Sequence, residues 1–337
     1  MKKNIKVLAA LSAAVLAFLA GNTPSFAAPL SGSVKDQIAT IQSLIQKNGA
    51  KWVAGETSIS RLPREEWKFR VGLDYQPITA PPIEETEVSA PLPPSLDWRD
   101  NNGNYVTGVR DQAKCGSCWA FALTAGLESN VLRSQNTGIT DIDLSEQVML
   151  SCSGTGSCNG GRLNANYLEN TGLPIEAAYP YTATDGSCDA AAPGWQSSAY
   201  KIGSWGSVSG HLSALQKALN TYGPLPTAFY VYEDFMYYKS GIYTHTTGSR
   251  LGGHAVLLVG YNDAEQYFIV KNSWGPDWGE NGFFRIAYSE LDTFVNFAMS
   301  TIAYQSKDAQ RRIEALNKTM EGINTDGSWG RVQPLFN

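Results

Sequence analysis

The sequence predicts an α+β fold in which helices come first and strands follow. In the first half of the body, apolar residues recur at the spacing of amphipathic helices. In the second half, short runs rich in β-branched and aromatic residues are separated by Gly, Asn and Asp turns. Helices and strands segregated in this way indicate an α+β domain, and we expect the functional site between the two halves.

The N-terminus has the pattern of a secretory signal peptide. Lysines precede an apolar run at residues 7–20, and Ser25 and Ala27 supply the small residues of a cleavage site. The run is too short for a comfortable transmembrane span. We therefore expect residues 1–27 to be removed, and the protein to be exported, secreted or periplasmic, without a membrane attachment.

Residues 28–92 are expected to form a removable pro-segment. Ile38, Ile41 and Ile45 recur at helical spacing and predict one amphipathic helix. Residues 77–94 are rich in proline and acidic side chains, which predicts an extended linker. A helix and an extended stretch ahead of a compact domain favour a pro-segment; an ordinary N-terminal subdomain is the alternative.

Three helices are expected at the start of the body, residues 93–302. Apolar side chains from Ala120 to Val131 share one face of a helix that begins near Cys118. A second, short helix follows Ser145, a suitable N-cap. A third helix covers residues 211–221.

Four strands are expected in the second half of the body, at residues 227–232, 255–261, 267–272 and 282–287. Residues 303–337 then form a C-terminal tail in which apolar residues again recur at helical spacing. We expect this tail to be an amphipathic helix that packs on the domain, with a partner-binding arm as the alternative.

The composition is that of a globular protein. The chain has 337 residues, of which 43% are hydrophobic and 17% charged, and its formal net charge is −5. These values are typical of a chain with a substantial core. Basic residues are scattered rather than clustered, so we expect no nucleic-acid partner and no binding to acidic membranes.

Two cysteines in a C-x-x-C spacing, Cys115 and Cys118, have three chemical interpretations. A zinc site would need four ligands, which Cys152 and Cys158 could complete. A redox dithiol usually lies in a βαβ context, and no clear strand leads into this pair. The third interpretation is a nucleophilic thiol: the chain has five cysteines, and an odd count leaves one thiol after two bridges.

A nucleophilic thiol needs a base, and the chain has only three histidines. His211 opens a helix and His245 lies among Thr, Ser and Gly, so we expect both to be solvated. His254 lies behind two glycines at the start of an apolar strand, which suits the wall of a cleft. Asn272 ends the next expected strand and could orient the imidazole through a hydrogen bond, because adjacent antiparallel strands would bring the two side chains together.

Four segments of the chain resemble the papain family of cysteine proteases. They are Gln112–Phe121 (QAKCGSCWAF), Cys158–Gly161 (CNGG), Gly253–Val256 (GHAV) and Lys271–Gly275 (KNSWG). The distances in sequence from Cys118 to His254 and Asn272 also agree with the family pattern. The resemblance covers about residues 93–300 and implies a two-lobed papain-like fold. One lobe would be helical, the other an antiparallel β-barrel-like sheet, with the active site in the cleft between them.

The resemblance implies a role for each catalytic residue. Cys118 would be the nucleophile, at the N-terminus of a helix whose partial charge favours a thiolate. His254 would be its proton-transfer partner, and Asn272 would hold the imidazole ring in place beneath the shielding indole of Trp274. The Gln112 amide and the Cys118 backbone N–H would form the oxyanion hole.

The resemblance also implies disulfides and a substrate-binding surface. The implied disulfides are Cys115–Cys158 and Cys152–Cys188. The implied substrate contacts are Gly160, Gly161, Ala228, Gly252, Gly253 and Trp274. Because Ala228 and Gly252 are small, we expect a roomy main pocket that tolerates apolar side chains. Arg162 stands where an aromatic residue is common, so the neighbouring preference is open.

The resemblance implies a cysteine endopeptidase of the EC 3.4.22 type. It would act on protein or peptide substrates through a thioester acyl-enzyme, as a secreted zymogen inhibited by its own pro-segment, which resembles the short pro-regions of cathepsin-B-like members. No His-His pair follows Cys158, which favours an endopeptidase over a dipeptidase. We expect a monomer that needs no metal and no cofactor. The alternatives are a peptide ligase or transpeptidase on the same acyl-enzyme, and a thiol-disulfide oxidoreductase that uses the C-x-x-C pair.

Overall fold

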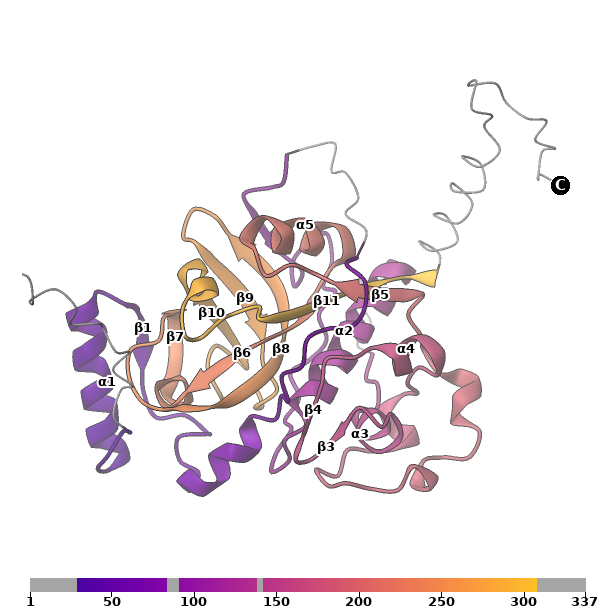
Figure 1. The fold of residues 1–337 in the computed structure, drawn as a ribbon, viewed down its shortest axis with the longest axis horizontal. Helices are drawn as coiled ribbons and strands as arrows, with labels where there is room; N and C mark the ends of the chain where they lie inside the picture. The colour runs from indigo at the N-terminus through magenta and orange to yellow at the C-terminus, as the bar shows by residue number, and fades with distance from the viewer. Residues whose placement is uncertain (1–28, 84–90, 138–141, 308–337) are drawn as a thin grey trace, which may run out of the picture.

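The computed structural model of the chain describes residues 29–83, 91–137 and 142–307. The signal peptide expected at residues 1–27 lies outside the described residues, as does nearly all of the tail expected at 303–337. Within the described part, two lobes lie side by side, one built on helices and one on a sheet (Figure 1). The α+β class is therefore confirmed.

The three helices expected in the body are all present, as α2, α3 and α5. Ser145 caps α3 by accepting the Val148 N–H, as its position predicts. In the described ranges, the α-helices are α1 (Val34–Asn48), α2 (Cys118–Gln135), α3 (Glu146–Cys152), α4 (Asn166–Asn170) and α5 (Leu212–Tyr222). The 3-10 helices there are η1 (Arg64–Arg70), η2 (Glu176–Ala178), η3 (Cys188–Ala190), η4 (Trp195–Ser198), η5 (Glu233–Tyr237) and η6 (Tyr288–Asp292).

The sheet is open and mostly antiparallel. Its strands follow the order β1 (Lys51–Ala54), β7 (Tyr238–Tyr243), β10 (Phe283–Ala287), β9 (Tyr267–Lys271), β8 (Arg250–Asn262), β6 (Leu225–Tyr232), β11 (Ser300–Gln305) and β5 (Ser204–Ser207). Strand β2 (Ser95–Asp97) also pairs with β8, and β3 (Gly156–Ser157) forms a separate hairpin with β4 (Gly160–Gly161). One pair, β7 with β10, is parallel. The four expected strands correspond to β6, β8, β9 and β10.

Helix α2 is the central element of the helical lobe. Its residues from Cys118 to Leu132 are all buried, as expected of a helix that is covered on every side. The helix ends at Asn136, whose φ of 51° closes it in the left-handed conformation. Each lobe has its own hydrophobic core, and Cys118 lies in the core of the helical lobe whereas Trp274 lies in that of the sheet lobe. The N-terminus of α2 therefore meets the sheet where the two cores adjoin.

The segment before the body packs closely on the sheet lobe. The predicted helix is confirmed as α1, with a capping box between Ser33 and Asp36. Strand β1, which the sequence did not predict, pairs antiparallel with β7 at the edge of the sheet. There the Trp52 ring lies 6.2 Å from the ring of Tyr238 and 5.2 Å from that of Tyr243. The segment thus continues the sheet of the domain it covers.

A second contact anchors the same segment through a buried acid, Glu233, in η5. Its side chain is 4% exposed and forms an ion pair with Arg64 of η1. Its carboxylate also accepts the Leu30 N–H at 2.7 Å. Nearby, the Thr57 hydroxyl donates to the carbonyl of Met236 at 2.6 Å. Polar contacts to η5 therefore hold this segment at Leu30, Thr57 and Arg64.

The expectation that His245 is a solvated loop residue is wrong. Its side chain is 19% exposed, and Nδ1 lies 3.2 Å from Oδ1 of the fully buried Asp234. The ring centroid also lies 4.0 Å from that of Tyr232. A composition of Thr, Ser and Gly suggested an exposed loop, but Asp234 draws this loop inward by accepting the N–H groups of Thr246 and Thr247. His211, by contrast, is exposed as expected.

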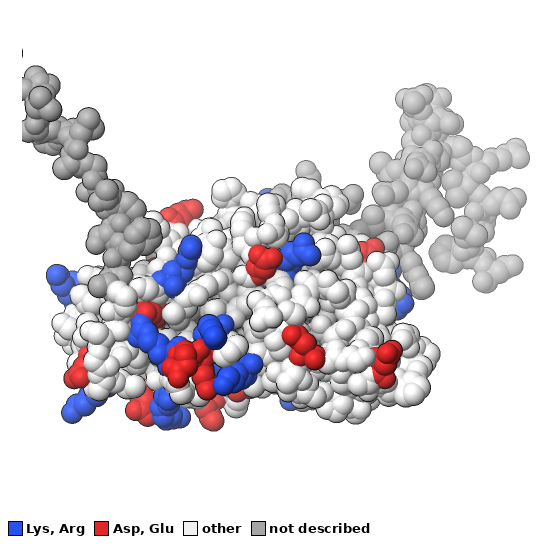
Figure 2. All heavy atoms as spheres, turned by 60° about the horizontal axis from the view of Figure 1, so that its bottom comes forward, with Lys and Arg blue, Asp and Glu red and all other residues white. Residues whose placement is uncertain are grey.

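The surface carries charges of both signs. In Figure 2, positive and negative side chains lie intermixed on the side of the face nearest the segment before the body, and the rest of that face carries few charges. Ion pairs in the described ranges include Arg61 with Glu56 and Lys114 with Glu66. Among the residues that the structure describes, no helix is both long and apolar enough to cross a membrane.

Candidate active site

Cys118 is the free thiol of the described chain and lies at the first turn of α2. Its Sγ accepts the backbone N–H of Ala255 at 3.4 Å. The other four cysteines form the bridges Cys115–Cys158 and Cys152–Cys188, the pairing that the family resemblance implies. Because Cys115 is bound to Cys158, it is not the redox partner of Cys118. The same bridges leave no pair of thiolates for the zinc site considered above.

His254 and Asn272 meet across two neighbouring strands, β8 and β9. Nε2 of His254 lies 2.7 Å from Oδ1 of Asn272, and the Trp274 ring covers the imidazole at a centroid distance of 4.9 Å. Among described residues, Nδ1 of His254 has no hydrogen-bond partner. Since Ala255 touches the thiol of Cys118 and directly follows His254, the imidazole and the thiol lie on adjoining positions of the site.

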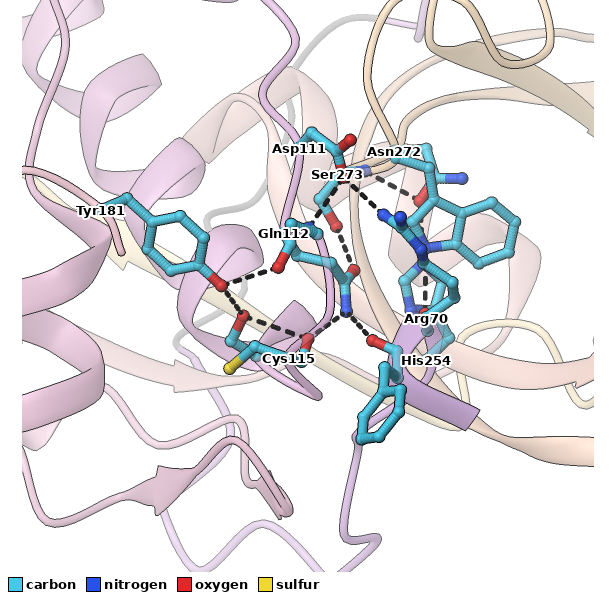
Figure 3. A network of polar contacts seen from close by, with 12 residues as sticks. Arg70, Asp111, Gln112, Cys115, Tyr181, His254, Asn272 and Ser273 are labelled. Atoms are coloured by element: carbon cyan, nitrogen blue, oxygen red, sulfur yellow. Dashed lines mark hydrogen bonds and ion pairs between the residues drawn. The ribbon is translucent and has the colours of Figure 1, made fainter. Parts of the chain in front are cut away.

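The Gln112 side chain lies beside the residues that lead into helix α2, and three hydrogen bonds hold it in one orientation (Figure 3). Its Oε1 accepts the Ser273 hydroxyl at 2.9 Å. Its Nε2 donates to the carbonyls of Cys115 and Phe69, each at 3.0 Å. The amide N–H therefore points to where a carbonyl oxygen lies, as an oxyanion donor must. Ser273 was not singled out from the sequence, although it stands between Asn272 and Trp274.

Residues 69–74 of the segment before the body fill the cleft. The Gly161 N–H donates to the carbonyl of Gly72 at 2.9 Å, and the Asp74 N–H donates to the carbonyl of Gly161 at 2.8 Å. Leu73 donates its N–H to the carbonyl of Gly253 at 2.9 Å. These contacts make Gly161 and Gly253 the two rims that hold an extended chain.

Gly72 lies where that chain passes over the nucleophile. A Cβ built at Gly72 would lie 2.1 Å from the carbonyl oxygen of Gly116, two residues before Cys118. Only a residue without a side chain fits there. On the other side of the chain, a Cβ at Gly252 would come within 2.9 Å of Val71. The glycine rims of the cleft and the glycine of the bound segment are therefore matched in shape.

The remaining predicted contacts line the floor and wall of the cleft. Ala228 is fully buried and pairs with Ala255 across β6 and β8. Leu73 packs against the core cluster that contains both alanines, which places an apolar side chain over the expected main pocket. Gly160 lies near the Gly72 carbonyl, and Trp274 donates its indole N–H to the carbonyl of Arg70 at 2.9 Å.

Burial sets the protonation states of the covered site. Burial raises the pKa of Cys118 to about 12, although backbone N–H groups, that of Ala255 first, oppose the shift. Burial also lowers the pKa of His254 to about 4, and the hydrogen bond that the imidazole makes to Oδ1 of Asn272 opposes this shift. Both shifts favour neutral groups, so the thiol is protonated and the imidazole uncharged while the segment covers the cleft.

The comparisons with known proteins agree with this geometry. The model for "Papain family cysteine protease" matches residues 92–304. Cathepsin B-like CP3 of Giardia intestinalis is 41% identical over 58% of this chain and 69% of its own length. Ananain of Ananas comosus is 30% identical over 77% of this chain and 76% of its own length. The structure of proCathepsin B S9 from Trypanosoma congolense superposes with a TM-score of 0.71 at 25% identity, over 82% of this chain and 99% of its own. The chain therefore belongs to the papain family of cysteine proteases.

Proposed function

We propose that this protease is an endopeptidase whose acyl-enzyme forms on Cys118 and which is made as an exported zymogen. One observation carries the proposal: the sole free thiol of the described residues adjoins a histidine that is held by Asn272 at 2.7 Å. The nucleophile, base and orienting group of covalent catalysis are thus present in one place.

In the proposed reaction, His254 takes the proton of Cys118 when the cleft is open to water and substrate. The thiolate then attacks the scissile carbonyl, and the developing oxyanion accepts hydrogen bonds from the Gln112 amide and the Cys118 backbone N–H. The imidazolium of His254 gives its proton to the leaving amine, and a thioester remains. Water, deprotonated by His254, hydrolyses the thioester and frees Cys118.

The geometry also supports a direction for the substrate. The leaving amine must depart beside His254, whose ring is covered by Trp274, and Trp274 contacts Arg70. The leaving half of a substrate therefore belongs on the Arg70 side, and the acyl half on the side of Gly161. A substrate would run from its N-terminal residues near Gly161 toward Arg70.

The bound segment runs the opposite way, which supports its role as an inhibitor. Its earlier residues, up to Arg70, lie on the leaving side, and its later residues, Leu73 and Asp74, lie beside Gly161. Its pairing with Gly161 is parallel. A chain in this direction does not present its carbonyl groups to Cys118 as a substrate does. We therefore assign residues 28–92 as the pro-segment and residues 93–302 as the catalytic domain.

The export of the zymogen rests on two features. Two disulfides suit an oxidising compartment, and residues 1–27 have the pattern of a cleaved signal peptide. N-terminal sequencing of the protein recovered outside the cytoplasm should begin at Ala28. A protein that is recovered only with Met1 in the cytoplasm would contradict export.

The proposed protease is a monomer, so size-exclusion chromatography should show a single copy of the chain.

The catalytic proposal is tested by labelling with a thiol-directed epoxide inhibitor, followed by peptide mapping. Trimmed enzyme should lose activity as one residue, Cys118, becomes modified, and Cys118→Ser should fold, remain unlabelled and be inactive. End-blocked peptides should be cut internally. Activity retained by Cys118→Ser would refute the nucleophile, and release of C-terminal dipeptides alone would refute the endopeptidase.

A further inference from the structure

The hydroxyl of Tyr181 lies between the two backbone segments that carry the proposed oxyanion donors. It donates to the carbonyl of Gln112 at 2.8 Å, and it lies 2.7 Å from Oγ of Ser117, the residue before Cys118. Gln112 and Ser117 are both fully buried. Figure 3 shows Gln112 between Tyr181 on one side and Ser273 on the other. One phenol therefore joins both sides of the proposed oxyanion hole.

The direction of these two hydrogen bonds follows from the number of donors. A carbonyl oxygen can only accept, so the single O–H of Tyr181 is donated to Gln112. The phenol oxygen is then left to accept, and its donor is the Ser117 hydroxyl. Burial raises the pKa of Tyr181, although the hydrogen bond from Ser117 opposes this shift, so the phenol keeps its proton. The result is a chain of hydrogen bonds from Ser117 through Tyr181 to Gln112, in which each bond strengthens the next.

Ser117 occupies the cap position of α2 but does not cap the helix with its side chain. A serine at this position ordinarily accepts an N–H of the first turn through its hydroxyl oxygen. The Ser117 side chain accepts none of these N–H groups and instead donates to Tyr181 at 2.7 Å. The serine therefore ties the turn before Cys118 to Tyr181 and takes up none of the N–H groups of the helix.

The backbone at Gln112 lies in a turn that needs support. The next residue, Ala113, has a φ of 51°, in the left-handed region that is unfavourable for a residue with a Cβ. Such a conformation persists where the surrounding contacts fix it. The Ala113 N–H is bound by Oδ1 of Asp111 at 2.8 Å, and the Gln112 N–H is bound by the carbonyl of Ser273 at 2.9 Å. Tyr181 binds the Gln112 carbonyl and so completes the set of bonds that fixes this turn.

We propose that Tyr181 is a positioning residue of the reaction, which holds the Gln112 and Cys118 donors at the spacing that an oxyanion needs. The inference rests on the proposed peptidase function, in which these two N–H groups stabilise the oxyanion. Loss of the hydroxyl would leave the Gln112 carbonyl and the Ser117 hydroxyl without this partner and would loosen both donors. Because Tyr181 acts through the donors, we expect a loss of roughly 3- to 30-fold in kcat, against about 10²–10³ for a donor itself.

The test compares trimmed Tyr181→Phe with the trimmed wild type on one end-blocked fluorogenic peptide. Phenylalanine keeps the ring that contacts Phe121 at a centroid distance of 4.8 Å and removes the hydroxyl alone. We expect kcat to fall by roughly 3- to 30-fold while KM changes little. Tyr179→Phe is the matched control, because it removes a hydroxyl that donates to the carbonyl of Ser187 at 3.0 Å, and it should keep the wild-type kcat.

Two further measurements separate positioning from general damage to the site. A peptide aldehyde forms a hemithioacetal with Cys118, and the oxygen of this adduct occupies the oxyanion hole. Its inhibition constant should therefore rise by about the factor by which kcat falls. Alkylation of Cys118 by iodoacetamide needs the thiolate but develops no oxyanion, so its rate in Tyr181→Phe should equal that of the wild type.

Ser117→Ala breaks the same chain of hydrogen bonds at its other end and should also lower kcat. If the two hydroxyls act as one chain, adding Tyr181→Phe to Ser117→Ala should cost less than Tyr181→Phe alone. An unchanged kcat in Tyr181→Phe, equal losses in kcat and alkylation rate, or fully additive losses in the double variant would overturn the inference while leaving the peptidase intact. A wild type that cleaves no peptide would instead count against the proposed function.

Discussion

Ser273 donates a hydrogen bond from its hydroxyl to Oε1 of Gln112 at 2.9 Å. Because the oxygen end of the amide is bound in this way, the N–H end must face the cleft. The same serine accepts the Gln112 backbone N–H at its carbonyl, also at 2.9 Å. The loop after β9 therefore orients both the base, through Asn272, and the oxyanion donor, through Ser273.

Ser273→Ala should lower kcat of the trimmed enzyme about tenfold, because the Gln112 amide loses the bond that orients it, a loss of roughly 1.4 kcal/mol in the transition state. KM should change little, since Ser273 is buried and its hydroxyl is bound to Gln112 rather than exposed in the cleft. Gln112→Ala should lower kcat by about 10²–10³. Ser273→Thr keeps a hydroxyl and is the control. Steady-state kinetics on one peptide give all values, and an unchanged kcat in Ser273→Ala would contradict the orienting role.

Gly72→Ala should weaken inhibition by the pro-segment, because the added Cβ would lie 2.1 Å from the Gly116 carbonyl. Overpacking of this kind costs about 1–3 kcal/mol, so we expect roughly 5- to 150-fold more peptidase activity from the untrimmed variant. Gly108→Ala is the matched control, because a Cβ there would meet no atom within 4 Å. If both untrimmed variants remain as latent as the wild type, the close approach at Gly72 does not control latency.

The thiol of the zymogen should react with iodoacetamide only in strong alkali. Burial raises the pKa of Cys118 to about 12, so the thiolate fraction is very small at neutral pH and grows as the pH approaches that value. Removal of the pro-segment admits water and should bring thiolate reactivity down to near-neutral pH. Alkylation rates measured across pH for both forms test this. Equal profiles for zymogen and trimmed enzyme would show that the pro-segment does not set the ionisation of Cys118.

Arg64→Ala should speed conversion of the zymogen. Arg64 pairs with Glu233, whose side chain is 4% exposed, and its loss leaves that carboxylate with the Leu30 N–H as its remaining described partner from the pro-segment. We expect conversion at least several times faster under mild acid, as followed by gel electrophoresis. Arg61→Ala is the control, because its ion pair with Glu56 is more than half exposed on both sides. Equal conversion rates in the two variants would exclude Glu233 as an anchor.

The ion pair of His245 should stabilise the protein in acid rather than in alkali. Its pKa is raised: burial acts to lower it, but the hydrogen bond and charge of Asp234, with Glu290, outweigh burial. A raised folded pKa gives stability that is fully present below the unfolded pKa of about 6.5 and is lost as pH rises through the folded value. His245→Gln should therefore lower Tm more at about pH 5 than at about pH 8. A larger loss at the higher pH would contradict this sign.

The positions of the three proposed catalytic residues could be predicted because each one lies in a short local pattern. Cys118 begins a helix of mostly apolar residues. His254 lies in β8 and Asn272 directly follows β9, so the pairing of these neighbouring strands brings the two side chains together. Asp234 and His245 were missed because the contact depends on how η5 and the loop after β7 fold inward. Neither segment carries a periodic pattern that would report this burial.

Strand β1 could not be predicted for a different reason. Its residues Lys51 to Ala54 pair with β7, and Trp52 lies opposite Gly241. A four-residue strand has too few positions to show a clear alternation, and its partner lies far along the chain. Pairing over such a sequence distance is set by the final packing, including the Trp52 ring between Tyr238 and Tyr243.

Because β1 belongs to the proposed pro-segment, the sheet lobe would have a different edge strand before and after removal of that segment. In the untrimmed chain β7 is an interior strand. Release of the pro-segment would make β7 an edge strand and would remove the Trp52 ring from Tyr238 and Tyr243. Unpaired strand borders recruit other extended chains. Removal of the pro-segment would therefore expose an unpaired strand edge in the same event that opens the cleft, and the trimmed protease would be more prone to self-association than its precursor.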